Sequence, residues 1–172
     1  RMSRRVNKQQ TIETIDRLRT GIPNLCLRTT MLTGFPGETD DQFEELVEFV
    51  NATRFDRLGV FSYSFEEATP SANLPDHIDD NVKSMRHETL MLAQQKIMHE
   101  RNKSLVNSRL EVMVDQAVPQ EDNAWVGRSK ADAPAIDSLV FLTGNGEQLS
   151  PGQIVEAEIV TVSEYDLIGA VL

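Results

Sequence analysis

The feature that most constrains the fold of this chain is a change of pattern near residue 104. Before it, apolar residues recur at helical spacing in three segments, and two short runs rich in branched residues lie between them. After it, short apolar runs follow one another, separated by turn-forming proline and glycine residues. Layers built from such different patterns belong to different units, so we expect one unit at residues 1–104 and another at 105–172.

The first unit is predicted to alternate helix and strand. We expect helices near residues 4–20, from Thr39 onward, and at 81–103, with strands at 25–33 and 57–65. Thr39 and Gln42 have the spacing of a capping box, which marks a helix start. The alternation implies parallel strands covered by helices, an α/β arrangement. Two strands cannot close a sheet, so this unit is predicted to belong to a larger α/β domain.

The second unit is predicted to be all-β. Five short strands are expected within residues 112–114, 125–126, 139–142, 154–162 and 167–172. Turn signals separate them, including Pro119 and the run from Gly144 to Gly146. Five short strands in so short a segment predict a small, closed or nearly closed β-barrel of the oligomer-binding type.

Composition excludes several classes of site and location. Cys26 is the single cysteine, and one cysteine cannot form an internal disulfide or hold an iron–sulfur cluster alone. The three histidines lack the close pairing of metal ligands, so we expect no metal site. No apolar run reaches the roughly 18 residues of a membrane span, and the start resembles no secretory signal. We therefore expect a cytoplasmic protein without a membrane partner.

Charge is unevenly distributed between the two predicted units. The net charge is −10, of which residues 105–172 carry 11 acidic and 3 basic side chains, a balance of −8. Residues 1–104 carry 16 acidic and 14 basic side chains, a balance of −2. An acidic surface repels phosphate backbones and attracts basic proteins, so nucleic acid is a less favoured partner than a basic protein. A merely solubilising surface is the alternative.

Four stretches together resemble the second half of the radical S-adenosylmethionine methylthiotransferase family. They are RTTMLTGFPGET at 28–39, FDRLGVFSYS at 55–64 with TPSA at 69–72, the helix around QQKI at 94–97, and GRSKADAPAID at 127–137. The last stretch is most similar to the branch that acts on small-subunit ribosomal protein S twelve. The branch that modifies tRNA usually shows Gly-Arg-Thr and asparagines there.

This resemblance implies a fold and an activity. The fold would be a partial TIM-like radical S-adenosylmethionine barrel with parallel strands, followed by a five-stranded TRAM β-barrel. The parent enzyme would use S-adenosylmethionine and two [4Fe–4S] clusters to add a methylthio group to the β-carbon of an aspartate in ribosomal protein S twelve. The chain has no CxxxCxxC motif, so we expect a carboxyl-terminal fragment that is inactive alone, binds no cofactor alone and contains no catalytic residue.

Two alternatives to this function stay open. One is a fragment of a methylthiotransferase acting on N6-isopentenyladenosine in tRNA, for which a basic β-unit would be expected. The other is a non-catalytic RNA- or protein-binding module.

The resemblance also implies cofactor-binding positions. Residues at the carboxyl ends of the two predicted strands would border S-adenosylmethionine, and these are Thr33, Gly34, Phe61, Tyr63 and Ser64. The guanidinium of Arg28 suits a carboxylate, either that of the cofactor or that of a structural salt bridge. Turn geometry for Gly34 and core packing for Phe61 are the competing interpretations.

Substrate contacts are predicted around one hairpin of the β-unit. Trp125, Arg128, Asp132 and Asp137 lie close together in the sequence. Exposed aromatic side chains of such barrels can stack on bases, but the acidic balance favours a basic protein. We expect the β-unit to bind ribosomal protein S twelve through its carboxylates.

Overall fold

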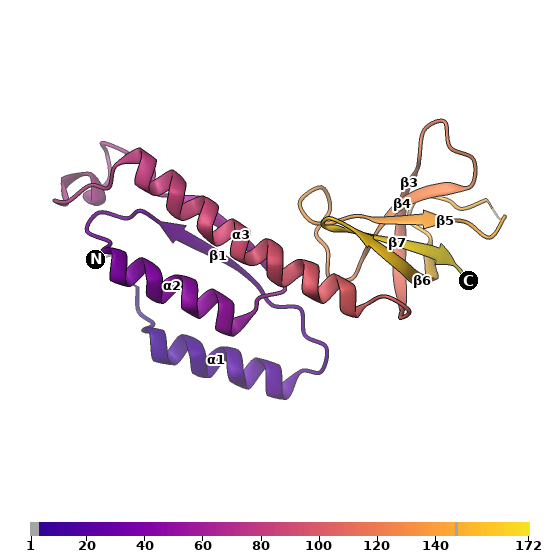
Figure 1. The fold of residues 1–172 in the computed structure, drawn as a ribbon, viewed down its shortest axis with the longest axis horizontal. Helices are drawn as coiled ribbons and strands as arrows, with labels where there is room; N and C mark the ends of the chain where they lie inside the picture. Colours follow the sequence, from indigo (N-terminus) through magenta and orange to yellow (C-terminus); the bar gives the residue numbers. More distant parts are fainter. Residues whose placement is uncertain (1–3, 147) are drawn as a thin grey trace.

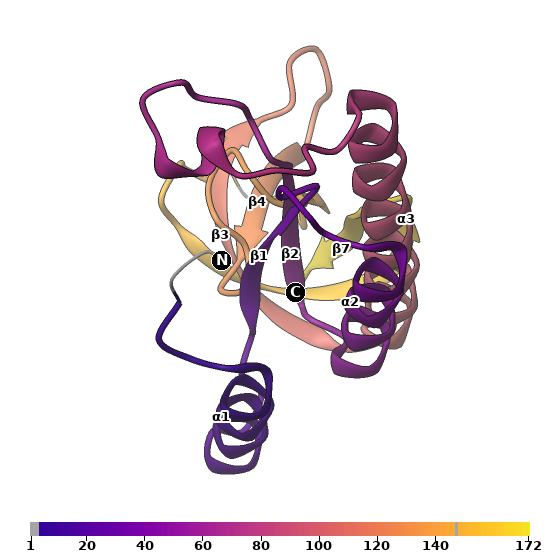
Figure 2. The ribbon, with the colours of Figure 1, turned by 90° about the vertical axis from the view of Figure 1, so that its left-hand side faces the viewer.

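Two parallel strands form the centre of the first unit. The computed structural model describes residues 4–146 and 148–172. Strand β1 (Arg28–Thr33) pairs with β2 (Arg57–Ser62) in register, from Arg28 opposite Arg57 to Thr33 opposite Ser62. Helices α2 (Asp40–Thr53) and α3 (Asp80–Ser104) lie on one side of this pair, as Figure 2 shows. Helix α1 (Lys8–Gly21) lies below β1 in Figure 2 and is linked to α2 by the Lys8–Glu45 ion pair. A short 3₁₀ helix, η1 (Pro70–Asn73), lies in the loop before α3 (Figure 1).

The helices cover only one face of the two strands. Leu58 and Val60 of β2 are buried against Val50 of α2 and against Leu90 and Ile97 of α3. The next side chain of β2, Phe61, points to the opposite face and is 63% exposed. The first unit therefore has a core on one side of its sheet and an open face on the other.

The helix starts follow local sequence signals. The predicted capping box is confirmed, because the side chain of Thr39 accepts from Gln42 N and the side chain of Gln42 accepts from Thr39 N. Asn7 and Gln10 form a second capping box, which is why α1 begins at Lys8 rather than near residue 4. The strands are shorter than predicted because their pairing begins at Arg28 and Arg57 and ends at Thr33 and Ser62.

The second unit is a closed β-barrel, as predicted. Its strands are β3 (Arg109–Ala117), β4 (Ala124–Ser129), β5 (Val140–Thr143), β6 (Ile154–Ser163) and β7 (Asp166–Val171), in the order β3-β4-β5-β7-β6. β5 and β7 pair in parallel, and the other pairs are antiparallel. Alternate residues such as Val112, Val114, Val140 and Leu142 fill the interior. This core shares no residue with the core of the first unit.

Helix α3 joins the two units. Its 25 residues span roughly 37 Å at 1.5 Å per residue, and its last turns lie beside the barrel (Figure 1). There the side chain of Asn102, which is 3% exposed, donates a 2.8 Å hydrogen bond to the carbonyl of Tyr165. One turn of the helix thus contacts the barrel directly. In the described part of the chain, no helix combines the length and apolar character needed to cross a membrane.

Candidate functional site at the strand ends

The carboxyl ends of β1 and β2 meet at one edge of the sheet. The carbonyl of Thr33 accepts a 2.9 Å hydrogen bond from Tyr63 N, which brings the two strand ends together. Thr33 and Gly34 are buried, and Tyr63 is 9% exposed. The structure therefore brings together three of the residues predicted to border a cofactor.

Glu38 fixes the turn that follows β1. Its Oε2 accepts a 2.6 Å hydrogen bond from Gly34 N and a 3.2 Å bond from Thr33 Oγ1. Gly34 has φ +76°, and a Cβ atom there would lie 2.5 Å from Cγ of Lys83. Only glycine combines this backbone conformation with this close approach. Turn geometry therefore accounts for the glycine at position 34 without any ligand.

Arg86 of α3 forms a buried ion pair with Glu38. Its side chain is 3% exposed, its Nη1 donates to Glu38 Oε2 at 2.7 Å, and its Nη2 donates to Asp40 Oδ1 at 2.6 Å. The guanidinium carbon lies 5.3 Å from the ring centre of Phe43. Arg86 falls within the helix predicted at 81–103, but the sequence pattern gave it no role. A buried arginine that binds two carboxylates is the missed part of this site.

Tyr63 is enclosed by protein side chains. Its ring meets the ring of Phe35 edge-on at 5.3 Å, and Nζ of Lys83 lies 5.6 Å from its centre. Its hydroxyl donates to Ser71 Oγ at 3.1 Å. Ser64 is exposed and donates to Glu66 Oε1 at 3.4 Å. Phe61 alone of these aromatic residues presents its ring to the open face of the sheet.

A hollow of about 660 Å³ lies beside the turn after β1. Leu32 and Phe35 form part of its wall, together with Glu38 and Gln42 at the start of α2. The lining combines apolar side chains with the carboxylate of Glu38, the amide of Gln42 and the guanidinium of Arg4, and it is suited to a ligand that carries both apolar and polar groups.

Arg28 lies at the other end of β1. Thr33 is five residue steps further along the strand, roughly 17 Å at 3.3 Å per residue. Its Nη2 forms an ion pair with Asp137, 109 residues away in the chain. The structure shows the salt bridge, which was one of the two interpretations of Arg28. Binding of the cofactor carboxylate by Arg28 stays a prediction.

Asp132 and Asp137 also take part in contacts between the two units. Arg57 forms an ion pair with Asp132, and its Nε lies 3.9 Å from Asp137 Oδ1. The carboxylates are 3% and 8% exposed, and the side chain of Arg57 is 13% exposed. We call Arg28, Arg57, Asp132 and Asp137 the inter-unit clasp. Both carboxylates are buried in ion pairs with arginines of the first unit, which corrects the prediction that they face a substrate.

Trp125 and Arg128 belong to the barrel itself. Trp125 is 8% exposed and packs in the barrel core, with Leu142 opposite it on β5. Arg128 forms an ion pair with Asp115 and donates to Sδ of Met113 at 3.1 Å. The expected exposed aromatic contact at Trp125 is therefore corrected, because its position in β4 directs the indole inward.

A cavity of about 620 Å³ lies between the two units. Cys26 lines it, and Cys26 Sγ lies 3.6 Å from the carbonyl of Ala131. Burial, with the nearby carboxylate of Asp56 as the next contribution, raises the pKa of the Cys26 thiol above its ordinary value. Within residues 4–146 and 148–172, no three His, Cys, Asp or Glu side chains are grouped so that they could hold a metal ion.

Comparison with known proteins shows what this chain is similar to. Residues 106–172 match the TRAM domain family. Three relatives carry the name ribosomal protein uS12 methylthiotransferase RimO: those of Clostridioides difficile (44% identical over 171 residues), Lachnoclostridium phytofermentans (46% over 169) and Geotalea uraniireducens (42% over 172). The alignments cover 98% to 100% of this chain but 38% of each relative. The chain is thus similar over nearly its whole length to part of proteins named ribosomal protein uS12 methylthiotransferase, and its residues 106–172 match the TRAM domain family.

Proposed function

We propose that this chain is the carboxyl-terminal part of a radical S-adenosylmethionine methylthiotransferase that modifies an aspartate of ribosomal protein S twelve. The observation that carries the proposal is similarity over 98% to 100% of the chain to proteins named for that activity. Residues 1–104 would belong to the radical domain and 105–172 to the TRAM domain. An enzyme with this substrate would work in the cytoplasm.

The open face of the β1–β2 pair supports a larger barrel. Parallel sheets are normally covered on both faces, and here Phe61 and Gly59 lie exposed on the face without helices. The chain spans 38% of the length of its relatives, which leaves room in such proteins for further strands. We infer that β1 and β2 pair with such strands and that their open face lines the interior of the barrel.

The strand-end residues fit part of a cofactor site. In barrels of parallel strands, ligands bind at the carboxyl ends, where Thr33, Gly34 and Ser64 lie. The exposed ring of Phe61 offers apolar contact to an adenine, and the backbone of the turn offers hydrogen bonds. We call Thr33, Gly34, Phe61 and Ser64 the cofactor rim. Tyr63 packs against Phe35 next to it. When bound, the cofactor supplies the radical chemistry that an unactivated C–H bond requires.

The chain does not fit an iron–sulfur cluster. Cys26 precedes β1, far from the strand ends, and such clusters are held by several thiolates. The two clusters of the proposed enzyme would therefore depend on cysteines outside this chain. The strand-end residues of this chain would contribute a binding surface for the cofactor and exclude water from it.

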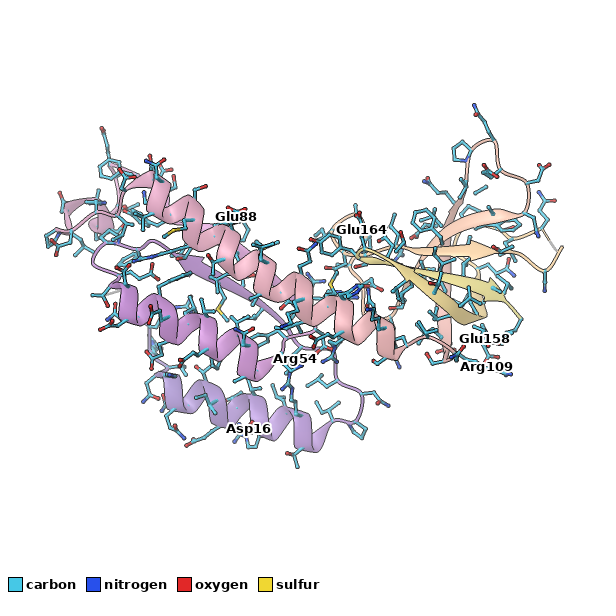
Figure 3. All side chains as sticks on the ribbon, in the orientation of Figure 1. Asp16, Arg54, Glu88, Arg109, Glu158 and Glu164 are labelled. Carbon is cyan, nitrogen blue, oxygen red and sulfur yellow. The ribbon has the colours of Figure 1, made fainter. Side chains whose placement is uncertain are left out.

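The surface of the TRAM domain supports a basic protein as its partner. Glu111 of β3 lies opposite Glu156 of β6 on the outer wall of the barrel, and both are exposed. Beside them, Arg109 lies opposite Glu158, as Figure 3 shows. Arg109 Nη1 lies 3.9 Å from Glu156 Oε1 and offsets part of the repulsion between the facing carboxylates, and a basic partner would relieve the remainder. The net negative charge of residues 105–172 disfavours tRNA, because it repels the phosphate backbone.

The Phe61→Ala variant tests the cofactor rim. It is made in the full-length methylthiotransferase to which we propose this chain belongs, with both [4Fe–4S] clusters reconstituted. We expect the Michaelis constant for S-adenosylmethionine to rise and methylthiolation of ribosomal protein S twelve, followed by mass spectrometry of the target peptide, to fall. Phe141→Ala is the matched control for the Michaelis constant, because Phe141 is also exposed but lies on β5 of the barrel, away from the strand ends. Methylthiolation of a tRNA adenosine instead of the protein would overturn the proposal.

A further inference from the structure

The clasp stands apart from the strand-end site and does not depend on the reaction. Arg28 and Arg57 are register partners at the first positions of β1 and β2, so their side chains project from the amino-terminal edge of the sheet. Asp132 and Asp137 belong to the loop between β4 and β5, residues 130–139, which we call the docking loop. The docking loop therefore meets the sheet at the edge opposite Thr33 and Ser62.

Hydrogen bonds of the docking loop's own residues help to hold its shape. Oδ2 of Asp132 accepts a 3.2 Å hydrogen bond from Ser129 N and a 2.5 Å bond from Ser129 Oγ. Oδ2 of Asp137 accepts a 2.6 Å bond from Ala133 N. Each aspartate thus folds the loop and receives an arginine of the other unit. A loop ordered in advance loses little conformational freedom on docking.

Apolar packing contributes little to this joint. The barrel core and the core of the first unit share no residue, and a cavity of about 620 Å³ separates them beside the clasp. Further polar contacts between the two units include those of Asn102 with Tyr165, of Cys26 with Ala131 and of Ser138 with Sδ of Met98. A buried, hydrogen-bonded ion pair contributes more to the geometry of a joint than to its stability, because the free energy of desolvating the two charges offsets most of their attraction.

We propose that Asp132 and Asp137 are positioning residues, and that through Arg57 and Arg28 they lock the TRAM domain in one orientation beneath the amino-terminal ends of β1 and β2. The clasp leaves the opposite edge, with Thr33 and Gly34, uncovered by the barrel. Loss of the clasp frees the TRAM domain to turn about the end of α3 while both cores stay folded.

The Arg57→Glu variant of the 172-residue chain tests this proposal. The carboxylate introduced at position 57 then faces the carboxylate of Asp132 and repels it, so the docking loop is expected to leave the sheet. Arg57 also lowers the pKa of the Cys26 thiol, so alkylation is compared at a pH high enough to ionise the thiol in both chains. There Cys26, whose Sγ lies 3.6 Å from the carbonyl of Ala131, should react with iodoacetamide several-fold faster in the variant, and small-angle X-ray scattering should show a larger radius of gyration. Arg57→Lys keeps the positive charge and is expected to stay close to the parent chain in both measurements.

Two controls separate release of the loop from unfolding. Trp125 is the single tryptophan and lies in the barrel core, so unchanged fluorescence shows that the barrel is intact. Lys8→Glu makes the same change of charge at the exposed Lys8–Glu45 pair and should alter neither reactivity nor size. If Arg57→Glu and Arg28→Glu each leave the alkylation rate and the radius of gyration unchanged, the clasp does not position the domain. If either variant unfolds the barrel, the domains are not independent and the proposal also fails.

Discussion

At the scale of the residue, the molecule depends on a few buried charges. The side chain of Arg86 is 3% exposed, and that of Glu38, its partner at the strand ends, is 14% exposed. Asp40, which the same arginine also binds, is 87% exposed. The two carboxylates therefore contribute very differently to stability, although one guanidinium holds both.

Arg86→Met should be strongly destabilising. The substitution leaves the largely buried carboxylate of Glu38 without its cation, a change that typically costs about 3–5 kcal/mol. Urea unfolding followed by circular dichroism measures the loss. Asp40→Asn removes an exposed partner of the same arginine and should cost at most about 1 kcal/mol. Equal losses in the two variants would contradict this account.

The thiol of Cys26 provides a pH-dependent prediction at the same scale. Burial and Asp56 raise its pKa, so the folded chain holds the thiol proton to a higher pH than the unfolded chain does. Only the thiolate reacts, so the midpoint of the alkylation rate against pH should lie above that of the chain in urea. A midpoint at or below that of the unfolded chain would show that the thiol is not shielded.

At the scale of the element, two strand glycines differ in what surrounds them. A Cβ at Gly127 of β4 would lie 2.4 Å from the carbonyl oxygen of Met113, whereas nothing lies within 4 Å of one at Gly59 of β2. Gly127→Ala should therefore push β4 from β3 and cost about 1–3 kcal/mol. Gly59→Ala should be neutral or slightly stabilising, because alanine restricts the unfolded chain. Thermal unfolding of both variants checks the contrast, which the opposite ranking would refute.

At the scale of the whole molecule, two cores are joined by one helix and one clasp. The barrel is closed and filled, whereas the sheet of the first unit has an open face. We expect the first unit to unfold at lower urea concentration than the barrel. Circular dichroism, which follows the three α-helices of the first unit, should change before the fluorescence of Trp125 in the barrel. Coincident transitions would show that the joint makes the molecule one cooperative unit.

The sequence by itself determined the elements and the kind of each unit. The capping box at Thr39, the helical periodicity up to Ser104 and the strand alternation after it are short-range signals, which depend on residues a few positions apart. The closed five-stranded barrel followed from the number and length of its strands. The resemblance at residues 127–137 indicated the branch of the family to which the similar proteins belong.

Only the tertiary structure decided what the charged residues do. Asp137 looks like a free surface carboxylate in the sequence, yet its partner Arg28 lies 109 residues away. Trp125 and Arg86 likewise acquire their roles from segments that local patterns do not connect. The physical reason is range: backbone preference acts over a few residues, whereas an ion pair needs two distant segments brought within about 4 Å by the packing of whole elements.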